Sequence, residues 1–452
     1  MEKKNSLVTG NVLASLLKFA WPVLLANILQ TVYSATDMWV VGRFAATADV
    51  SAVSISSQIM LTVTLVVFGL TTGASVLLGQ YCGGGNERGM RDVIGTSIVF
   101  FAIVAGVVMV PLLLRHGAII HAMRTPAEAV LPARQYLYIC SAGIVFIIGY
   151  NVVSSVMRGL GDSKSPLLFV GVSAVINVVV DVVLVKYARM GAAGAAIATV
   201  GAQGGSMVFA LLYLRRKGLG FPFSRKDIAL RGSVIRPVVR VGAPLSLQEL
   251  LVTLSFVFIT FTVNQMGLNE SAAVGIVEKL ISFLAMPTFA MSSAVATMSA
   301  HNIGARQFAR ARRCLLCGIG VSMVIALAAN LMTFFAGARL VGIFTADRQV
   351  MAVGADYIRS YGLDCILMAV VFNINGYLSG CNHSTFSMVH SLFATLCIRV
   401  PMVYIISHTA STTLFTLGLA APSSSLGSVI LCAVYLAWIA RHEDQEKMVL
   451  TK

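Results

Sequence analysis

Residues 96–114 read TSIVFFAIVAGVVMVPLLL and contain no charged side chain. A run of about 20 apolar residues is long enough to cross the roughly 30 Å hydrocarbon core of a bilayer as a helix. Residues 318–335 are likewise apolar on every face, whereas a transmembrane β-strand alternates apolar and polar positions. The whole chain is 57% hydrophobic and 11% charged, with mean hydropathy +0.85. The sequence therefore predicts an all-α polytopic membrane protein and excludes a soluble enzyme and a β-barrel.

Similar apolar runs recur along the chain, separated by charge clusters and by Gly, Pro or Asn turns. They predict about twelve transmembrane helices, placed roughly at 19–41, 55–79, 95–114, 134–157, 166–185, 192–214, 241–266, 273–300, 314–336, 356–379, 387–408 and 419–440. Of the 33 lysines and arginines, 22 fall in connections on one side of the membrane and eight in connections on the other. By the positive-inside rule both termini are expected to be cytoplasmic, in a cell inner or plasma membrane. The net charge of +15 thus orients the chain, and no nucleic acid partner is expected.

The chain aligns with itself at an offset of 221 residues, so that Gly83 matches Gly304 and Tyr136 matches Tyr357. Each half would hold six helices, and both halves begin on the same side of the membrane, which indicates a parallel repeat. We predict two pseudo-symmetric six-helix lobes at 1–214 and 241–452, with a basic cytoplasmic linker at 215–240. This plan is typical of an alternating-access carrier, and a duplicated channel is the alternative.

The first half carries a set of acid, amide and hydroxyl side chains inside its apolar runs. The set is Asp37, Asn151, Asn177, Asp181 and Thr199. Asn177 and Asp181 share a helix face because they are four residues apart. A carboxylate at the membrane centre costs about 2.5–3.5 kcal/mol, so two of them need a partner, a proton or a cation. Carboxylate, amide and hydroxyl oxygens suit Na⁺, and two close carboxyls also suit H⁺.

The second half has no such set, because Met402 and Ile398 stand where the repeat places Asp181 and Asn177. We therefore expect one cation site, in the first half. The alternative is that the aspartates are solvated helix ends, since Asp181 is close in sequence to Lys186. No metal site other than for Na⁺ is expected, because the single CxxC pair, at Cys314, has no second pair or histidine nearby.

Several motifs, in this order and spacing, resemble the multidrug and toxic compound extrusion (MATE) family of antiporters. They are Trp21-Pro22 through Gln30 to Asp37, Val41-Gly42-Arg43, Gly79-Gln80 with Gly83, Met157 to Asp162, Asn177 to Asp181, Gly191 to Thr199, and His301 to Ala305. The resemblance implies a V-shaped central cleft between two lobes and a cation role for the five first-half residues. It also implies that Pro22 and Tyr136 support that site, with Pro22 where the first helix can bend.

The helix near 241–266 carries Leu254-Ser255 where the NorM-like branch of the family has a glutamate. Gln248-Glu249 instead follow Pro244, and Arg399-Val400-Pro401 lies in the eleventh segment, so the chain resembles the DinF-like branch more closely. A second cation site is not expected. The candidate substrate-cleft residues are Gln30, Gln248, Glu249, Glu278, Lys279, Asp364, Asn373 and Arg399. The alternative is a structural network such as Arg399 with Asp364 or Glu278.

The resulting hypothesis is a secondary antiporter that exports drug-like organic compounds or metabolites in exchange for H⁺ or Na⁺. The expected partners are an amphipathic small molecule and the lipid bilayer, without a cofactor, and the protein is expected to be a monomer. The alternative function is a lipid-linked oligosaccharide or peptidoglycan-precursor flippase of the related two-lobe class. Enzyme activity is not expected, because no HExxH, GxSxG or GxGD motif occurs.

Overall fold

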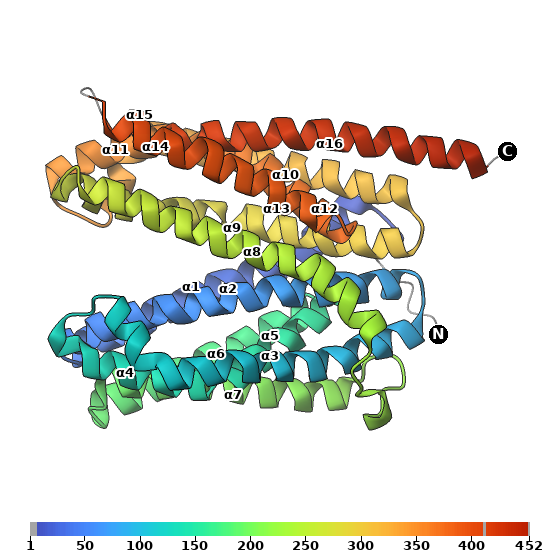
Figure 1. Cartoon of the computed structure of the whole chain (residues 1–452), viewed down its shortest axis with the longest axis horizontal. Helices are drawn as coiled ribbons and strands as arrows, with labels where there is room; N and C mark the ends of the chain where they lie inside the picture. The colour runs from blue at the N-terminus through green and yellow to red at the C-terminus, as the bar shows by residue number, and fades with distance from the viewer. Residues whose placement is uncertain (1–6, 410–412, 451–452) are drawn as a thin grey trace. The chain divides into compact units, whose positions relative to one another are not determined.

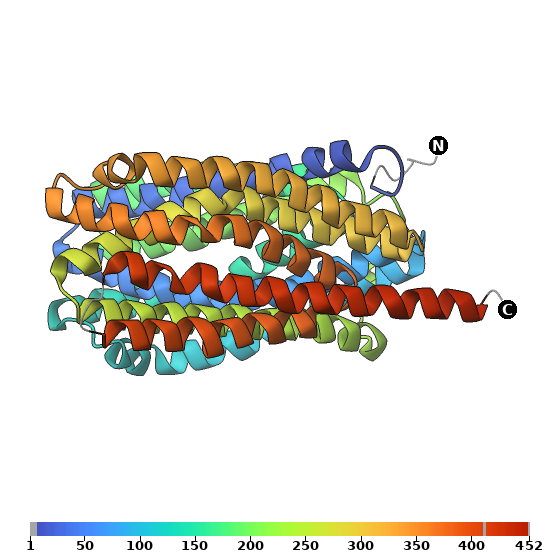
Figure 2. The same ribbon diagram turned by 90° about the horizontal axis from the view of Figure 1, so that it is seen from above.

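The computed structural model describes residues 7–409 and 413–450, and every regular element in these residues is helical (Figures 1 and 2). Ten of the helices are long and apolar enough to cross a membrane, and two bent helix pairs raise the number to as many as twelve. The prediction of an all-α polytopic membrane protein is confirmed.

The first half contains seven α-helices and a π-helical segment (Figure 1). They are α1 (Val12–Phe44), α2 (Thr47–Gly83), α3 (Glu87–Ala122), α4 (Ala127–Ala142), α5 (Ile144–Gly159), α6 (Lys164–Asp181), η1 (Val182–Tyr187) and α7 (Gly191–Lys217). A short 3-10 helix, η2 (Arg225–Asp227), lies in the connection to the second half.

The second half repeats this order. Its helices are α8 (Gly232–Asn264), α9 (Leu268–Gly304), α10 (Phe308–Gly342), α11 (Arg348–Gly362), α12 (Asp364–Gly380), α13 (Ser384–Phe393), η3 (Ala394–Arg399), α14 (Val400–Ser407), α15 (Leu414–Gly418) and α16 (Ala420–Leu450). From α8 to α12, each helix begins and ends within one residue of its first-half counterpart shifted by 221. The internal repeat read from scattered identities is therefore also a repeat of helix boundaries.

Two of the expected segments are bent. Residues 134–157 belong to α4 and α5, which meet at an angle of 50°, and residues 356–379 belong to α11 and α12, which meet at 41°. Each bend lies beside a glycine that touches a neighbouring helix: Gly143 contacts Val200 of α7, and Gly362 contacts Thr333 of α10. A side chain at either glycine would collide with that neighbour, so the bend and the close approach occur together.

The chain divides into two compact units, Met1–Ser246 with Ala300–Phe308 and Leu247–Ser299 with Ala309–Lys452. The division cuts through α8 and α9, so the first turns of α8 and the last turn of α9 pack with helices of the first half. Ser246 Oγ donates to the Val66 carbonyl at 2.6 Å, and Gly83 of α2 contacts the backbone of His301. Glycine at position 83 permits this contact because any Cβ would overlap the His301 carbonyl.

Candidate functional site

Two aspartates from different helices face each other inside the first unit. The carboxyl group of Asp37 on α1 lies within hydrogen-bonding reach of that of Asp181, the last residue of α6. Asp181 is fully buried and Asp37 is half-buried. Among the described residues, no donor reaches Oδ1 of Asp37 or either oxygen of Asp181. Carboxylates only accept hydrogen bonds, and like charges repel, so the pair must share a proton or hold a cation to be stable.

Asn177 lies one turn before Asp181 on α6 and is 1% exposed. Neither its amide oxygen nor its amide nitrogen has a hydrogen-bond partner in the described part of the chain. Buried amides of this kind are normally satisfied, so an unpartnered one calls for an explanation. Its oxygen is the type of ligand that a hard cation takes together with carboxylates.

Tyr136 of α4 and Thr199 of α7 extend the site toward neighbouring helices. The phenol of Tyr136 lies near the Thr199 hydroxyl and interacts electrostatically with both aspartates. α6 packs on α1 and α7, and α7 also packs on α4, which brings these four helices together. The structure thus places Asp37, Asp181, Tyr136 and Thr199 in one cluster.

Asn151 and Pro22 lie differently from the members of that cluster. The Asn151 amide donates to the Ile147 carbonyl of its own helix at 2.8 Å, and no hydrogen bond joins it to the aspartates in residues 7–409. Pro22 is buried within α1, about 22 Å along the axis from Asp37 at the usual helical rise. It removes one backbone hydrogen bond from α1 at that point.

Lys186 does not neutralise Asp181. Its ammonium group lies over the rings of Phe44 and Tyr187, 5.1 Å from each centroid. No basic residue exerts a noticeable charge effect on either aspartate. Asp181 also marks the change from α-helix to the π-helical segment η1, and such segments occur frequently at functional sites.

A further polar group lies on the same face of α1. Tyr33 lies near Gln30 on its own helix and Gln203 on α7, and it interacts electrostatically with Asp37. Tyr33 also lines an apolar groove of about 300 Å³ between α1 and α6, together with residues such as Val175. The sequence reading identified Gln30 but missed Tyr33 and Gln203. Gln203 could have been found as a polar residue in an otherwise apolar run.

The second unit holds a separate charged cluster. Arg399, at the end of η3, donates from Nη2 to the hydroxyl of Tyr361 at 2.9 Å, and its guanidinium lies 4.4 Å from the ring centroid of Phe256. It interacts electrostatically with Asp364 of α12 and Glu278 of α9. It closes no ion pair with either acid, and one oxygen of each acid is buried without a hydrogen-bond partner in the described residues.

The other second-half candidates lie outside this cluster. Lys279 is exposed, although the preceding residue belongs to the cluster. Gln248 accepts from the Ser387 hydroxyl at 3.4 Å, and Glu249 is half-buried one residue later. Asn373 is fully buried and donates to a serine hydroxyl on α10 at 2.9 Å. The seven second-half candidates therefore do not all belong to the Arg399 cluster.

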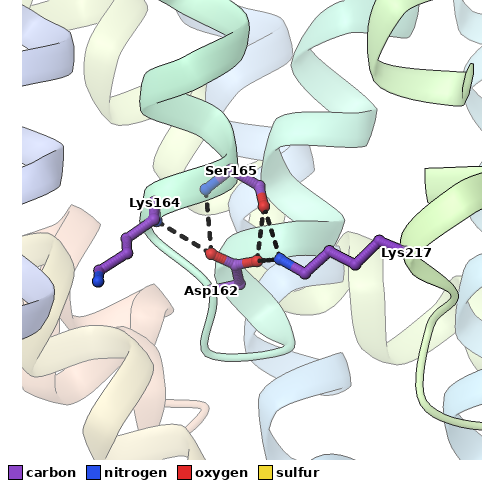
Figure 3. Close-up of polar contacts among 4 residues, drawn as sticks. All are labelled: Asp162, Lys164, Ser165 and Lys217. Atoms are coloured by element: carbon purple, nitrogen blue, oxygen red, sulfur yellow. Dashed lines mark hydrogen bonds and ion pairs between the residues drawn. The ribbon is translucent and has the colours of Figure 1, made fainter. Parts of the chain in front are cut away.

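A polar group at the start of α6 accounts for the end of the Met157–Asp162 motif (Figure 3). Asp162 accepts from the backbone N–H groups of Lys164 and Ser165, both at 3.0 Å, and from the Ser165 hydroxyl at 2.6 Å. The ammonium group of Lys217, at the end of α7, lies 2.6 Å from its Oδ2. Partial burial alone would raise the pKa of Asp162, but the hydrogen bonds from Lys217 and Ser165 outweigh it and hold that pKa below its ordinary value.

The geometry can be compared with known proteins. The sequence profile of the MatE family matches residues 22–183 and 244–405, one match in each half and most of the chain. The chain belongs to the MatE, or MATE, family of membrane transporters. The family assignment made from the motifs is thereby confirmed.

Curated relatives of this MATE protein are named probable multidrug resistance proteins. The probable multidrug resistance proteins YpnP and YoeA of Bacillus subtilis (strain 168) are 30% identical over 407 residues and 25% identical over 446 residues. These alignments cover 88% of the chain and 89% of YpnP, and 97% of the chain and 96% of YoeA. The probable multidrug resistance protein NorM of Thermotoga maritima is 24% identical over 407 residues, covering 86% of the chain and 84% of NorM.

Solved structures show the same fold. A crystal structure of MATE in the bent conformation superposes with a TM-score of 0.91, covering 100% of both chains at 19% identity. A transporter of the MOP superfamily from Pyrococcus furiosus superposes with a TM-score of 0.88, covering 97% of both chains at 20% identity. The chain is thus a multi-pass membrane transporter of the MATE multidrug efflux family, whose substrate is a small molecule.

Proposed function

We propose that this MATE protein is a secondary antiporter that exports amphipathic drug-like compounds or metabolites in exchange for H⁺ or Na⁺. The observation that carries the proposal is the carboxyl pair of half-buried Asp37 and buried Asp181, in which Asp37 Oδ1 and both Asp181 oxygens have no hydrogen-bond donor among the described residues. Within a membrane transporter, a pair that must be neutralised is a site that loads and unloads with the coupling ion. No cofactor is needed for this exchange.

The oxygens around the pair support ion coupling. Asn177 and Thr199 add an amide oxygen and a hydroxyl to the two carboxyls, and Tyr136 adds a phenol. In the described residues, no group of three or more His, Cys, Asp or Glu side chains is close enough to hold a metal ion. A monovalent hard cation or a shared proton is therefore the occupant that these neutral oxygens suit.

Ion binding at the pair would act on α1. One carboxyl belongs to α1 and the other to α6, so neutralising the pair removes the repulsion between these helices and draws α1 onto α6. Pro22 weakens α1 locally because it cannot donate a backbone hydrogen bond, which lets the helix bend in response. We propose that this movement couples ion binding to substrate release, by alternating access of two lobes.

The nature of the substrate is supported by α1 as well. The groove lined by Tyr33 and Val175 is apolar apart from hydroxyl groups, so it favours molecules with an apolar face. Gln30 and Gln203 add hydrogen-bonding groups at Tyr33. Relatives named as probable multidrug resistance proteins support drug-like compounds as substrates.

We further propose lobes at 1–214 and 241–452, joined by a cytoplasmic linker at 215–240, with both termini cytoplasmic in the inner or plasma membrane. The positive-inside distribution of lysines and arginines supports this orientation. The absence of an acid at Leu254 and Ser255 supports the DinF-like branch, and a monomer is the proposed functional unit.

The test uses purified protein in proteoliposomes with an imposed pH or Na⁺ gradient and measures the transport of ethidium and norfloxacin. Wild-type transport is expected to follow one of the two gradients. Asp37→Asn and Asp181→Asn are each expected to abolish gradient-driven transport, because an amide cannot release a proton or supply a charged ligand.

Asp347→Asn is the matched control. Asp347 is an exposed N-cap residue of α11, and asparagine caps a helix about as well as aspartate does. This variant makes the same chemical change far from the site and is expected to transport like the wild type. The proposed function would be excluded if neither gradient changed the transport rate. It would also be excluded if Asp181→Asn transported at the wild-type rate.

A further inference from the structure

The two halves of the chain treat buried carboxyl groups in opposite ways. In the first half, Asp37 and Asp181 face each other with no arginine or lysine acting on them. In the second half, Glu278 and Asp364 both interact electrostatically with the guanidinium of Arg399. Each half thus holds a pair of intramembrane acids that is not related to the other by the repeat, and among the described residues only the pair in the second half lies near a basic side chain.

The position of Arg399 is fixed by groups other than the acids. Tyr361 accepts its Nη2 hydrogen bond at 2.9 Å, and the ring of Phe256 covers the guanidinium at 4.4 Å from the centroid. The ring of Tyr361 lies 5.8 Å away, which adds a second aromatic contact. These contacts fix the position of the guanidinium without an ion pair in the described part of the chain.

Both acids carry a buried carboxyl oxygen that is left without a hydrogen bond from the described residues. Asp364 is 4% exposed, its Oδ1 has no hydrogen-bond partner in the described residues, and it is within reach of the Ser425 hydroxyl of α16. Glu278 Oε1 is likewise buried and unpartnered there. The other titratable groups near the cluster are Tyr357 of α11 and Cys365 of α12, and an ordinary phenol and thiol are uncharged at neutral pH. Two carboxylates and one guanidinium leave a single negative charge, whereas the first-half pair leaves two.

We propose that Arg399 is a tethered counter-cation that takes the place of one coupling ion in the second half. It neutralises one of the two acids permanently, so the second half takes up one cation fewer than a bare acid pair would. Ion loading is thereby concentrated in the first half. This inference goes beyond the proposed function and rests on it only for the identity of the ions, H⁺ or Na⁺.

The test counts cations on purified, detergent-solubilised protein. Binding of ²²Na⁺ at fixed pH is measured together with the infrared carboxylic-acid C=O band in Na⁺-free buffer, which reports protonated acids. Arg399→Gln is expected to gain one Na⁺ or one protonated carboxyl per chain relative to the wild type. Arg399→Lys keeps the charge and is expected to show no gain.

The double variant Arg399→Gln with Asp364→Asn removes one positive and one negative charge and is expected to return to the wild-type count. Arg359→Gln, an exposed arginine on α11, is the matched control and should leave the count unchanged. A folded Arg399→Gln protein with the wild-type count by both probes would overturn the proposal, and so would an equal gain in Arg399→Lys.

The proposal can also be tested if the Arg399→Gln variant does not fold. If Arg399→Gln alone does not fold, charge balance predicts that the double variant folds, because the uncompensated buried acid has been removed. A double variant that folds no better would show that Arg399 acts only by packing against Phe256 and Tyr361. A failure of the proposed function would look different. If Asp37 and Asp181 do not bind the coupling ion, the double variant Asp37→Asn with Asp181→Asn keeps the wild-type cation count, whereas Arg399→Gln still gains one cation per chain.

Discussion

The ammonium group of Lys217, the last residue of α7, lies 2.6 Å from Oδ2 of Asp162, which lies two residues before α6 begins (Figure 3). The two residues are 55 positions apart in the sequence. Asp162 also accepts the backbone N–H groups of Lys164 and Ser165, so one side chain both caps the start of α6 and holds the end of α7.

Asp162→Ala is expected to lower the free energy of unfolding by about 1–2 kcal/mol, mostly through loss of the helix cap. Lys217→Met should cost less than about 1 kcal/mol, because the Lys217 side chain is 41% exposed and water screens the pair. Urea unfolding in detergent measures both values. Equal costs for the two variants would mean that the ion pair, and not the cap, is the main contribution.

The depressed pKa of Asp162 predicts a specific dependence on pH. A carboxyl whose pKa is lower in the folded than in the unfolded state stabilises the fold fully at pH values above its unfolded-state pKa, which is ordinarily 3.8 for aspartate. That contribution is lost as the pH falls through the lower, folded-state pKa. Wild-type stability should therefore fall more steeply than that of Asp162→Asn as the medium is acidified below about pH 4. Parallel curves for the two proteins in that range would contradict the prediction.

Tyr136→Phe is expected to weaken binding of the coupling ion without abolishing transport. The phenol lies near the Thr199 hydroxyl and both aspartates, and losing one hydrogen-bonding group at a bound ion costs about 1 kcal/mol, or roughly fivefold in affinity. The ion concentration at half-maximal transport measures the effect. Tyr138→Phe makes the same change at a residue that is 51% exposed and should match the wild type. A shift of the same size in both variants would remove Tyr136 from the site.

Gly83→Ala is expected to destabilise the first unit. A Cβ at Gly83 would overlap the carbonyl of His301, so α2 and the end of α9 would have to separate, at a cost of about 1–3 kcal/mol. Gly106→Ala on α3 adds a Cβ to open space and should be neutral or stabilising. The thermal midpoints of the two variants in detergent give the comparison, and equal midpoints would show that the contact at Gly83 is loose.

Much of the fold was predictable because both the apolar runs and the internal repeat can be read directly from the order of residues in the chain. The bends at Gly143 and Gly362 were not, because they depend on close contact with Val200 and Thr333 of other helices. A sequence pattern contains no information on which glycine will meet a neighbour. The segments predicted at 134–157 and 356–379 therefore lie where the sequence placed them, and nothing in the sequence indicated their bends.

The same distinction applies to the candidate site. Asp37 and Asp181 stood out because an intramembrane carboxylate is costly wherever it lies. Glu278 and Lys279 stood out for the same reason, yet only Glu278 reaches the Arg399 cluster, because adjacent residues on a helix point about 100° apart. Which of two neighbours turns inward is decided by helix packing.

Asp49 illustrates a residue that the sequence reading did not single out. Its Oδ1 accepts the backbone N–H of Ala192 at the start of α7 at 2.9 Å, and its Oδ2 accepts that of Ala46 at 3.3 Å. Gly191, with φ of +53°, brings its backbone against this carboxylate, so a side chain there would collide with it. One acid near the start of α2 thus also caps a helix that begins 142 residues later.

Asp49→Ala is expected to lower the free energy of unfolding by about 1–2 kcal/mol, because the first turn of α7 would lose its acceptor. Asp49→Asn keeps an acceptor oxygen and should recover most of this loss. Since α7 carries Thr199, the alanine variant should also weaken ion binding, whereas Asp347→Ala, which removes the N-cap of α11, should reduce stability alone. Combined measurements of unfolding and of half-maximal ion concentration separate the two effects. Unchanged ion binding in a destabilised Asp49→Ala protein would mean that Thr199 is positioned by packing and not by this cap.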